Sequence, residues 1–546
     1  MPVPDLFIIA NLIAERARSH PDEAVLTFEN NGEVETRTYR QLWDNGQRLA
    51  AALDQRGLRK GDRFAVLLLN HPEFVEAMIA SAILATVFVP IDPRARDAKL
   101  AYMLNNSGCV GAICGHYALE NLQDVAVRVP KIAWAYVLGA DGGQFQRQSN
   151  FALYSLEEAL AAPSPAVIEV RTQDAREPMQ VMYTSGTTGD PKGIVVPHQR
   201  FGTVSNHGEA VFGYRHDDRP YTGLSLTHGN AQFVTLGPSL KMGLHAVISR
   251  KFSKSRLWDI VRRFECTTFA LLGGMVTALY SEPARPDDAK NPVRLVISAG
   301  MPAAIWENFA KRFGVDIFEF YGAVEGGMAF QRPGEGPIGS CGRAAPGLIA
   351  KVIDDKGVEV PRGSSGELIF QLSDGPFPPV QYLGNPDASV KKTAGGWLRS
   401  GDIVHMDGDG WIFFEYRAGG GIRRNGEFIS PALIEKVLAE HPDIDDTFVY
   451  GIANASGAPG ERDIVASVVT KGNAPLDARA LIPWLHSRLE TSMLPDLIQP
   501  VSEIPKTASE KPQERFLVDL LKSNPDQIIN VNAFARTPKS TEEKIK

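Results

Sequence analysis

The stretch that decides the fold class runs from FAVLLLN (residues 64–70) through VFVPID (87–92) to CVGAIC (109–114). Helical patterns separate these short apolar runs, one beginning at Pro72 and another near Lys99. Strands that alternate with helices along a chain form a parallel sheet covered by helices. The same alternation recurs between residues 245 and 322, in HAVIS, TTFALL, RLVISAG and VDIFEFYG. The sequence therefore predicts an α/β protein whose ligands lie beyond the carboxyl ends of the strands.

A Gly-rich, charged segment divides the chain into two unequal parts. YRAGGGIRRNG (416–426) follows the strand-like WIFFE (411–415) and has the composition of a linker between domains. The residues after it predict a second, smaller α/β unit. Residues 523–546 are polar with Lys-rich ends, so we expect a flexible tail there.

Composition excludes several function classes. The 57 Lys and Arg residues against 64 Asp and Glu residues give a net charge of −7, which is not the basic balance of a nucleic-acid-binding protein. The longest apolar stretch, 77–91, is shorter than the roughly 18 residues that a membrane span needs. No basic segment precedes the first apolar stretch, as it would in a signal peptide. The cysteines, too few for a disulfide framework, point with these features to the cytoplasm: Cys109, Cys114, Cys266 and Cys341.

The sharpest local motif is the polar loop YTSGTTGDPKG (183–193). Its glycines can turn backbone N–H groups inward, while its hydroxyls and its lysine add donors and positive charge, as a polyanion cradle requires. It is not a Walker P-loop, because Pro191 stands where that motif has glycine and a strand-like IVV (194–196) follows. The alternative is a polar surface hairpin. The residues predicted to bind phosphate are Thr184, Ser185, Gly186, Thr187, Thr188, Gly189 and Lys192.

Further motifs occur in a fixed order along the chain. They are VPIDPRA (89–95), SAGMP (298–302), YGAVE (321–325), GSCGRAAPG (339–347), GEL (366–368), WLRSGD (397–402) and PKTASEK (505–511). Together with the loop at 183–193 and the segment 416–431, this set resembles the adenylate-forming superfamily, which includes acyl-CoA ligases, firefly luciferase and the adenylation domains of peptide synthetases. The resemblance spans residues 10 to 522. It implies an N-terminal domain for acid and nucleotide (1–416), a hinge (417–421) and a small mobile lid domain (422–522), with the tail at 523–546.

The resemblance also implies an activity, that of an acyl-CoA ligase. In the superfamily a carboxylate attacks the α-phosphorus of ATP, pyrophosphate leaves, and the CoA thiol then attacks the acyl adenylate so that AMP departs. The implied cofactors are ATP or AMP, CoA and Mg²⁺. Because charge accumulates on phosphate oxygens, fixed donors and cations would supply most of the catalysis.

Four residues match the superfamily's nucleotide and metal positions. By resemblance, Tyr321 and SAGMP enclose the adenine ring, and Asp402 and Arg417 bind the ribose hydroxyls. Glu325 is the carboxylate expected to hold Mg²⁺, a cation that favours oxygen ligands. Taken singly, Glu325 could belong to a solvated turn and Asp402 could cap a loop.

Two further residues match positions near the reacting carboxylate. His228 corresponds to a residue beside the acyl pocket, although a lone histidine is often structural. Lys511 corresponds to the lysine that bridges the carboxylate and the α-phosphate, a task that suits a compact ammonium on a long stem. For the second step the lid would turn about the hinge and present the CoA-binding residues Gly426, Arg423 and Arg424.

Small residues in the expected walls of the acid pocket indicate which kind of acid it accepts. Glycines there would leave room for a bulky or apolar acid: Gly273, Gly274, Gly300, Gly326 and Gly327.

Four positions depart from the superfamily pattern. Val324 replaces a threonine whose hydroxyl contacts the α-phosphate, and losing such a hydrogen bond costs about 1.5–3 kcal/mol. Gly419 and Gly420 stand where a charged hinge residue is usual, and Glu510 replaces the glycine before Lys511. These changes favour a second hypothesis, a thioligase that uses a preformed acyl adenylate supplied by a partner adenylating enzyme. Two others remain: acyl transfer to a carrier-protein thiol in trans, and a non-catalytic protein that binds AMP or acid.

Overall fold

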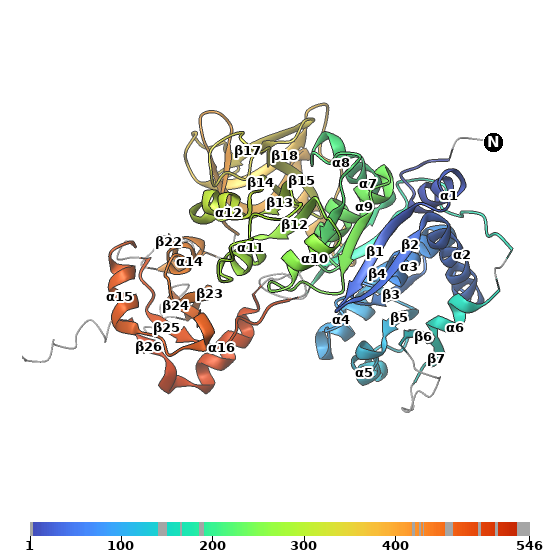
Figure 1. Ribbon diagram of the computed structural model, residues 1–546, viewed down its shortest axis with the longest axis horizontal. Helices are drawn as coiled ribbons and strands as arrows, with labels where there is room; N and C mark the ends of the chain where they lie inside the picture. The colour runs from blue at the N-terminus through green and yellow to red at the C-terminus, as the bar shows by residue number, and fades with distance from the viewer. Residues whose placement is uncertain are drawn as a thin grey trace, which may run out of the picture.

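The architecture is that of a two-domain α/β protein, as the sequence predicts (Figure 1). A computed structural model describes residues 4–139, 150–163, 166–184, 191–417, 421–424, 427–429, 431–453, 462–489, 493–507 and 512–531. Three sheets form the N-terminal domain, and a two-stranded and a four-stranded sheet belong to the C-terminal domain.

The first sheet has seven strands in the order β7-β6-β5-β3-β4-β8-β9, parallel except for the antiparallel pair β8 and β9. It contains the strands predicted from residues 64–114. Its elements are β3 (Arg63–Leu67), α3 (Pro72–Leu84), β4 (Val87–Pro90), α4 (Asp97–Ser107), β5 (Gly111–Gly115), α5 (His116–Asp124), β6 (Trp134–Leu138), β7 (Ala152–Ser155), α6 (Leu156–Ala161), β8 (Pro178–Thr184) and β9 (Lys192–Pro197).

The longest apolar stretch belongs to this sheet and its helices. Every residue of α3 is buried, and most of them are apolar, as is typical of a helix enclosed on all sides. Within the part of the chain that the structure describes, no helix has both the length and the apolar character needed to cross a membrane.

The second sheet has nine strands in the order β16-β15-β14-β13-β12-β10-β11-β1-β2. Its central strands are parallel, and antiparallel strands extend it at both edges. The four strands predicted between residues 245 and 322 are β11 (Ala246–Ser249), β12 (Thr268–Leu272), β13 (Leu295–Ala299) and β14 (Asp316–Ala323).

The other strands of this sheet are β1 (Ala24–Asn30), β2 (Glu33–Thr38), β10 (Pro220–Thr222), β15 (Gly326–Gln331) and β16 (Arg343–Ala344). The helices packed around it are α1 (Ile9–Ser19), α2 (Tyr39–Gln55), α7 (His198–Ser205), α8 (His207–Ala210), a π-helical segment η3 (Ala231–Leu236), α9 (Gly237–Met242), α10 (Leu257–Arg263), α11 (Gly273–Tyr280) and α12 (Trp306–Phe313). One large hydrophobic core joins these elements to the first sheet.

The third sheet is antiparallel throughout and lies against β15 and β16. It consists of β17 (Leu348–Ile353), β18 (Gly366–Leu372), β19 (Leu398–Met406) and β20 (Ile412–Arg417), with α13 (Pro386–Lys392) beside β19. Its register places Asp402 opposite Arg417, so the folding of one strand pair brings two predicted site residues together.

The C-terminal domain has its own hydrophobic core. Its elements are β21 (Ile422–Arg424), β22 (Glu427–Ile429), α14 (Pro431–Ala439), β23 (Ile444–Ala453), β24 (Arg462–Thr470), α15 (Ala478–His486), β25 (Leu497–Pro500), α16 (Glu514–Ser523) and β26 (Ile529–Asn530). Because β26 pairs with β25 and Val531 is buried, this domain extends into the segment that composition suggested was a flexible tail.

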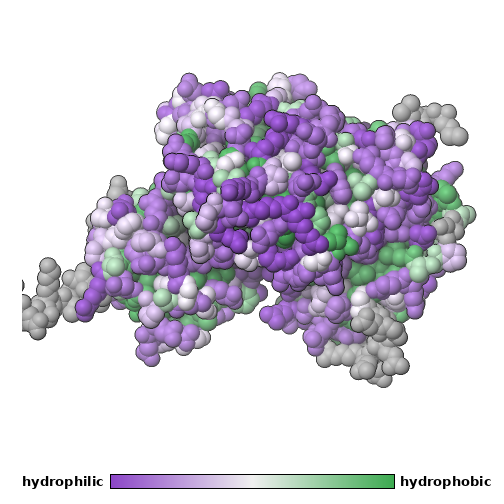
Figure 2. All heavy atoms as spheres, viewed as in Figure 1, coloured by the Kyte–Doolittle hydropathy of each residue, from purple (hydrophilic) through white to green (hydrophobic). Residues whose placement is uncertain are grey.

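The surface and the cysteines complete the description. On the face shown in Figure 2, hydrophilic residues predominate and hydrophobic ones are scattered. All four cysteines are buried and carry free thiols.

Candidate functional site

Three predicted nucleotide-binding residues meet at the edge between the second and third sheets. Tyr321 lies near the carboxyl end of β14, and its hydroxyl donates a hydrogen bond to the carboxylate of Asp402 on β19. Arg417 Nη1, at the end of β20, lies 3.5 Å from Asp402 Oδ1. Burial, and then the nearby Asp402 carboxylate, raise the pKa of Tyr321, so its hydroxyl stays a donor at neutral pH. The Tyr321 ring stacks on Phe370 with 6.1 Å between ring centroids.

A second group of side chains surrounds Glu325. The hydroxyl of Tyr382 donates to Glu325 Oε1 over 2.8 Å, and Lys392 Nζ lies 3.7 Å from the same oxygen. Burial alone would raise the pKa of Glu325, but the Lys392 ammonium and the Tyr382 hydroxyl outweigh it and lower that pKa. Glu325 is therefore ionised at neutral pH, as a ligand of Mg²⁺ must be.

Whether Mg²⁺ suits this site depends on which other side chains could bind the ion. No cluster of three or more His, Cys, Asp or Glu side chains suited to a metal occurs in the described ranges. One carboxylate completed by substrate phosphates and water is the usual protein environment of Mg²⁺, and Glu325 fits that arrangement.

The predicted phosphate loop connects β8 to β9 as an antiparallel hairpin in which Thr184 pairs with Lys192. Lys192 Nζ lies 5.5 Å from the centroid of the Tyr382 ring, which brings the loop's lysine next to the Glu325 group. Tyr183 anchors the hairpin to α4 by donating to Met103 O over 3.0 Å. The other predicted phosphate ligands, Ser185, Gly186, Thr187, Thr188 and Gly189, lie outside the described residues.

His228 precedes η3, a buried segment in contact with β12. Its Nδ1 accepts the N–H of Asn230 over 3.2 Å, so one ring nitrogen serves the local backbone. Its predicted role beside the acyl group remains a prediction.

The predicted acyl-pocket glycines have two different surroundings. Gly273 at the start of α11 approaches the Gly300 carbonyl so closely that a Cβ would lie 2.6 Å from its oxygen. Gly274 and Gly300 are exposed near the ends of β12 and β13. At Gly326 and Gly327, by contrast, a Cβ would lie 2.4 Å from Phe377 and 2.6 Å from Phe370. On that side the room inferred from these two glycines is filled by phenylalanine rings.

The predicted CoA-binding and lysine-loop residues belong to the C-terminal domain. Arg424 donates to the Asp496 carboxylate over 2.8 Å and to Leu494 O over 2.6 Å, so its guanidinium is engaged within its own domain. Gly426, Lys511 and Glu510, the hinge glycines Gly419 and Gly420, and the side chain of Arg423 lie outside the described residues. Their roles remain predictions.

Sequence reasoning missed several residues of the site. Tyr382 and Lys392 stand in no recognised motif, so only the fold brings them to Glu325. Glu319 is different, because it lies two residues before Tyr321 and therefore on the same side of β14. This buried carboxyl accepts the N–H groups of Gly300 and Met301, and burial raises its pKa to about 8. An acidic residue in register with a motif residue of the same strand was the available signal.

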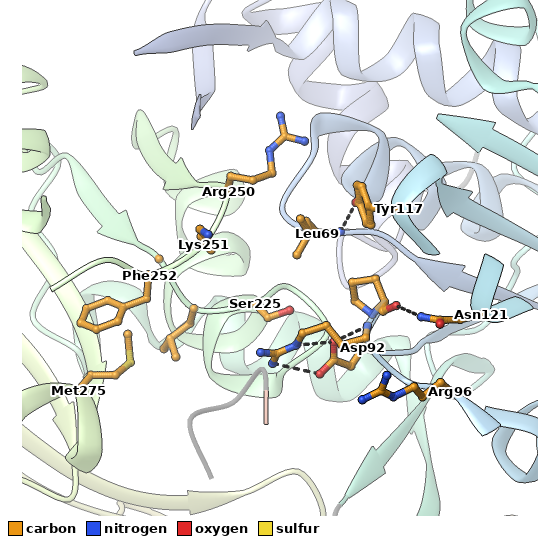
Figure 3. A pocket seen from close by; sticks show the side chains of 14 residues that line it. Leu69, Asp92, Arg96, Tyr117, Asn121, Ser225, Arg250, Lys251, Phe252 and Met275 are labelled. Atoms are coloured by element: carbon orange, nitrogen blue, oxygen red, sulfur yellow. Dashed lines mark hydrogen bonds and ion pairs between the residues drawn. The ribbon is translucent and has the colours of Figure 1, made fainter. Parts of the chain in front are cut away.

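A cavity of ≈ 730 Å³ lies where several strands end, as the fold class predicts (Figure 3). Its walls come from residues 92–96 after β4, 223–225 after β10 and 250–252 after β11, together with Met275 of α11. Four cations line it: Arg94, Arg96, Arg250 and Lys251. Asp92 pairs with Arg94 at 3.2 Å, and Phe252 and Met275 give one end of the cavity an apolar wall.

Comparison with known proteins places this geometry in context. The AMP-binding enzyme family matches residues 13–374, and the AMP-binding enzyme C-terminal domain matches residues 433–511. The medium/long-chain-fatty-acid–CoA ligase FadD17 of Mycobacterium marinum is 30% identical over 478 residues, which are 87% of this chain and 89% of that ligase.

Two solved structures share the fold. The anthranilate CoA ligase AuaEII in complex with anthranoyl-AMP superposes with a TM-score of 0.82 at 24% identity, covering 96% of this chain and 99% of that one. The o-succinylbenzoate CoA synthetase of Bacillus subtilis, in complex with ATP and magnesium ion, gives a TM-score of 0.74 at 23% identity, with 93% and 99% covered.

Proposed function

The chain is an acid–CoA ligase of the AMP-binding enzyme family, and we propose that it makes acyl-CoA from a carboxylic acid in two steps through an acyl adenylate. The observation that carries this proposal is the meeting of two groups from separate motifs. Tyr321, Asp402 and Arg417 form one, and Glu325 with its cationic surroundings forms the other. A nucleotide needs both, because its ribose requires hydrogen-bond acceptors and its phosphates require positive charge.

Asp402 has the capacity to hold the ribose. An ionised carboxylate offers about four lone-pair positions, and Tyr321 and Arg417 engage one oxygen each. The remaining positions suit the two ribose hydroxyls, and Arg417 restrains the carboxylate while they bind. Glu319 supports the adenine side indirectly, since it holds the backbone N–H groups of the SAGMP turn in place.

Two cationic side chains and one carboxylate surround the place proposed for the phosphates. Lys192 and Lys392 flank Tyr382 and Glu325, so positive charge meets the phosphates as negative charge accumulates on them. Bound Mg²⁺ would neutralise part of that charge, with Glu325 as its protein ligand. Lys511 is proposed to bridge the carboxylate and the α-phosphate, and His228 to line the acyl side.

The acceptor of the second step is proposed to be CoA. Its nucleotide carries a diphosphate and a 3′-phosphate, and the cavity beside Arg94, Arg96, Arg250 and Lys251 offers several cations to such a ligand. A carrier-protein phosphopantetheine lacks the 3′-phosphate, so this lining favours CoA. We retain the proposal of an apolar acid, now supported by Met275 and Phe252 rather than by Gly326 and Gly327.

A second candidate function is the thioligase that starts from a preformed adenylate. The observation that favours it concerns Val324, whose methyl Cγ2 lies 3.2 Å from the position of a Cβ on Gly229. An apolar side chain packs where the superfamily has a hydroxyl for the α-phosphate, so adenylation loses one hydrogen bond.

Two assays separate the candidates. The complete ligase exchanges labelled pyrophosphate into ATP with its cognate acid, whereas the thioligase makes acyl-CoA only from a synthetic acyl adenylate and CoA. Rapid exchange rules out the thioligase. If exchange is absent, Val324→Thr and Glu510→Gly restore part of it, by up to about ten- to a hundredfold for one recovered hydrogen bond to a charged group.

A further inference from the structure

Arg200 is a cation beside the site that neither motif nor resemblance assigns. It lies in the first turn of α7, and its Nη2 donates to the carbonyl oxygen of Ala323 over 3.2 Å. Ala323 ends β14 and is followed by Val324 and Glu325, so Arg200 touches the turn that carries the Mg²⁺ ligand. Figure 1 shows α7 beside α8 and α9.

The guanidinium has no counter-ion within the described residues. Its Nε is enclosed and, within the part of the chain that the structure describes, has no hydrogen-bond partner. Burial lowers the pKa of Arg200, and only the charge of Glu325 opposes this. Glu325 is already engaged by Lys392 and Tyr382.

A further titratable group near Arg200, His207, does not compensate its charge. His207 on α8 has an enclosed Nδ1 without a partner. Burial first, and then the charge of Arg200, lower the pKa of His207, which leaves this ring neutral at pH 7. A buried cation without an anion is unfavourable. By its whole-residue surface Arg200 is partly rather than fully buried.

A purely structural role would not require this charge. Arg332, directly after β15, serves a comparable structural purpose, since its Nη2 donates to Ala210 O over 2.9 Å. That arginine is half exposed and has Glu335 at 4.0 Å as a counter-charge. Any neutral donor could satisfy the Ala323 carbonyl, so the positive charge of Arg200 exceeds what the turn needs.

We propose that Arg200 binds an anionic oxygen group of the ligand at the Tyr321–Glu325 turn and so helps to determine which ligand the enzyme accepts. The inference rests on the proposed function. The anionic group has two possible sources, a phosphate of the nucleotide or a second carboxylate of the acid. The first would compensate for the hydroxyl missing at Val324, and the second would select dicarboxylic acids.

The test compares Arg200→Gln and Arg200→Lys with the matched control Arg332→Gln in the full chain. Gln keeps a donor for Ala323 O without the charge, and Lys keeps the charge without the planar fork. Titration calorimetry measures the affinities for AMP and for a pair of acids of equal length, octanoate and suberate. We expect Arg200→Gln to weaken one anionic probe by about ten- to a hundredfold, Arg200→Lys to lose less, and Arg332→Gln to change nothing.

The pattern of weakened affinities identifies the source of the anionic group. A weakened affinity for AMP assigns Arg200 to a phosphate, and a lost preference for suberate over octanoate assigns it to a second carboxylate. If Arg200→Gln and Arg200→Lys keep the wild-type affinity for AMP and the wild-type ratio between the acids, the proposal is overturned and Arg200 only braces the turn. Thermal unfolding of each variant shows whether Arg200→Gln is folded. If it is not, Arg200→Lys is compared with the wild type instead.

Wild-type thioester formation from synthetic acyl adenylates and CoA is measured separately. Its failure counts against the proposed function, whereas AMP binding still tests Arg200.

Discussion

At the scale of single residues, Asp402 is the position on which we propose that nucleotide binding depends most. Its carboxylate receives the Tyr321 hydroxyl and faces the Arg417 guanidinium at 3.5 Å. We predict that Asp402→Ala weakens AMP binding by about ten- to a hundredfold, because hydrogen bonds to a charged group are lost and Arg417 loses its partner. Calorimetric titration with AMP measures this, and Asp407→Ala, in the turn after β19, is the control. An equal affinity in Asp402→Ala and Asp407→Ala would contradict the assignment.

Glu319 gives a prediction about pH. Burial raises its pKa to about 8 in the folded protein, above the ordinary value of 4.5 that applies in the unfolded chain. The folded state therefore holds a proton that the unfolded chain has released, and stability falls as the pH rises from about 5 to about 8.

Glu73 and Glu435 also have raised pKa values, about 8 and about 7, so they contribute in the same direction. The contribution of Glu319 is the difference between wild type and Glu319→Gln, which cannot ionise. We expect the urea midpoint of the wild type to fall more between pH 5.5 and pH 8.5 than that of the variant, on the basis of this linkage. Parallel pH dependence in the two proteins would refute the shifted pKa.

At the scale of elements, two glycines with similar backbone angles distinguish packing from strain. Gly327 on β15 has φ +71 and Gly334 in the next turn has φ +75. A Cβ would meet Phe370 of β18 at 2.6 Å on Gly327 but nothing within 4 Å on Gly334. We predict that Gly334→Ala costs about 1–3 kcal/mol of unfolding free energy from the backbone conformation alone. Gly327→Ala should cost about 1–3 kcal/mol more from overpacking.

Urea unfolding of both variants measures the difference. Equal costs would mean that Gly327 borders open space, as the sequence-based reading of the acid pocket assumed. A larger cost for Gly327→Ala than for Gly334→Ala would place Gly327 at the contact between the second and third sheets.

The elements also show what the sequence can predict. The strands at 64–114 and 245–322 were predictable because alternating apolar runs and helical patterns determine them locally. Tyr321, Asp402 and Arg417 were predicted through motifs that the superfamily shares, and the structure brings these three side chains together. Tyr382 and Lys392 were not, because no local pattern marks a side chain whose partner lies far away in the sequence.

Other misassignments have a physical cause of the same kind. Glycine has no side chain, so the amino-acid sequence alone cannot distinguish a glycine in a turn from one at a close contact or one beside an open pocket. The polar segment after residue 523 was assigned to a tail from its composition. Strand β26 within it has only two residues, and its pairing with β25 holds it in the sheet.

At the scale of the whole molecule, one lysine joins the two domains. Lys254 Nζ, in the segment between β11 and α10, lies 3.2 Å from Glu282 of its own domain and 3.3 Å from Asp445 of β23. Lys254 is partly exposed, so we predict a small, salt-dependent effect of at most about 1 kcal/mol. Asp445→Lys should shift the distribution of domain arrangements, because it places a like charge opposite Lys254.

Small-angle scattering at low and high salt measures this distribution, with Asp443→Lys as a control just before the strand. Identical scattering curves for the wild type and Asp445→Lys at low salt would show that the pair does not stabilise the observed arrangement.

The whole account depends on the two-step ligase reaction. Its most direct measurement is mass spectrometry of the products formed from ATP, CoA and a panel of fatty, aryl and dicarboxylic acids, with synthetic acyl adenylates in parallel. We predict ATP-dependent formation of an acyl-CoA together with AMP, reduced in Asp402→Ala. A folded protein that binds AMP yet forms no thioester from any acid or any adenylate would contradict the account.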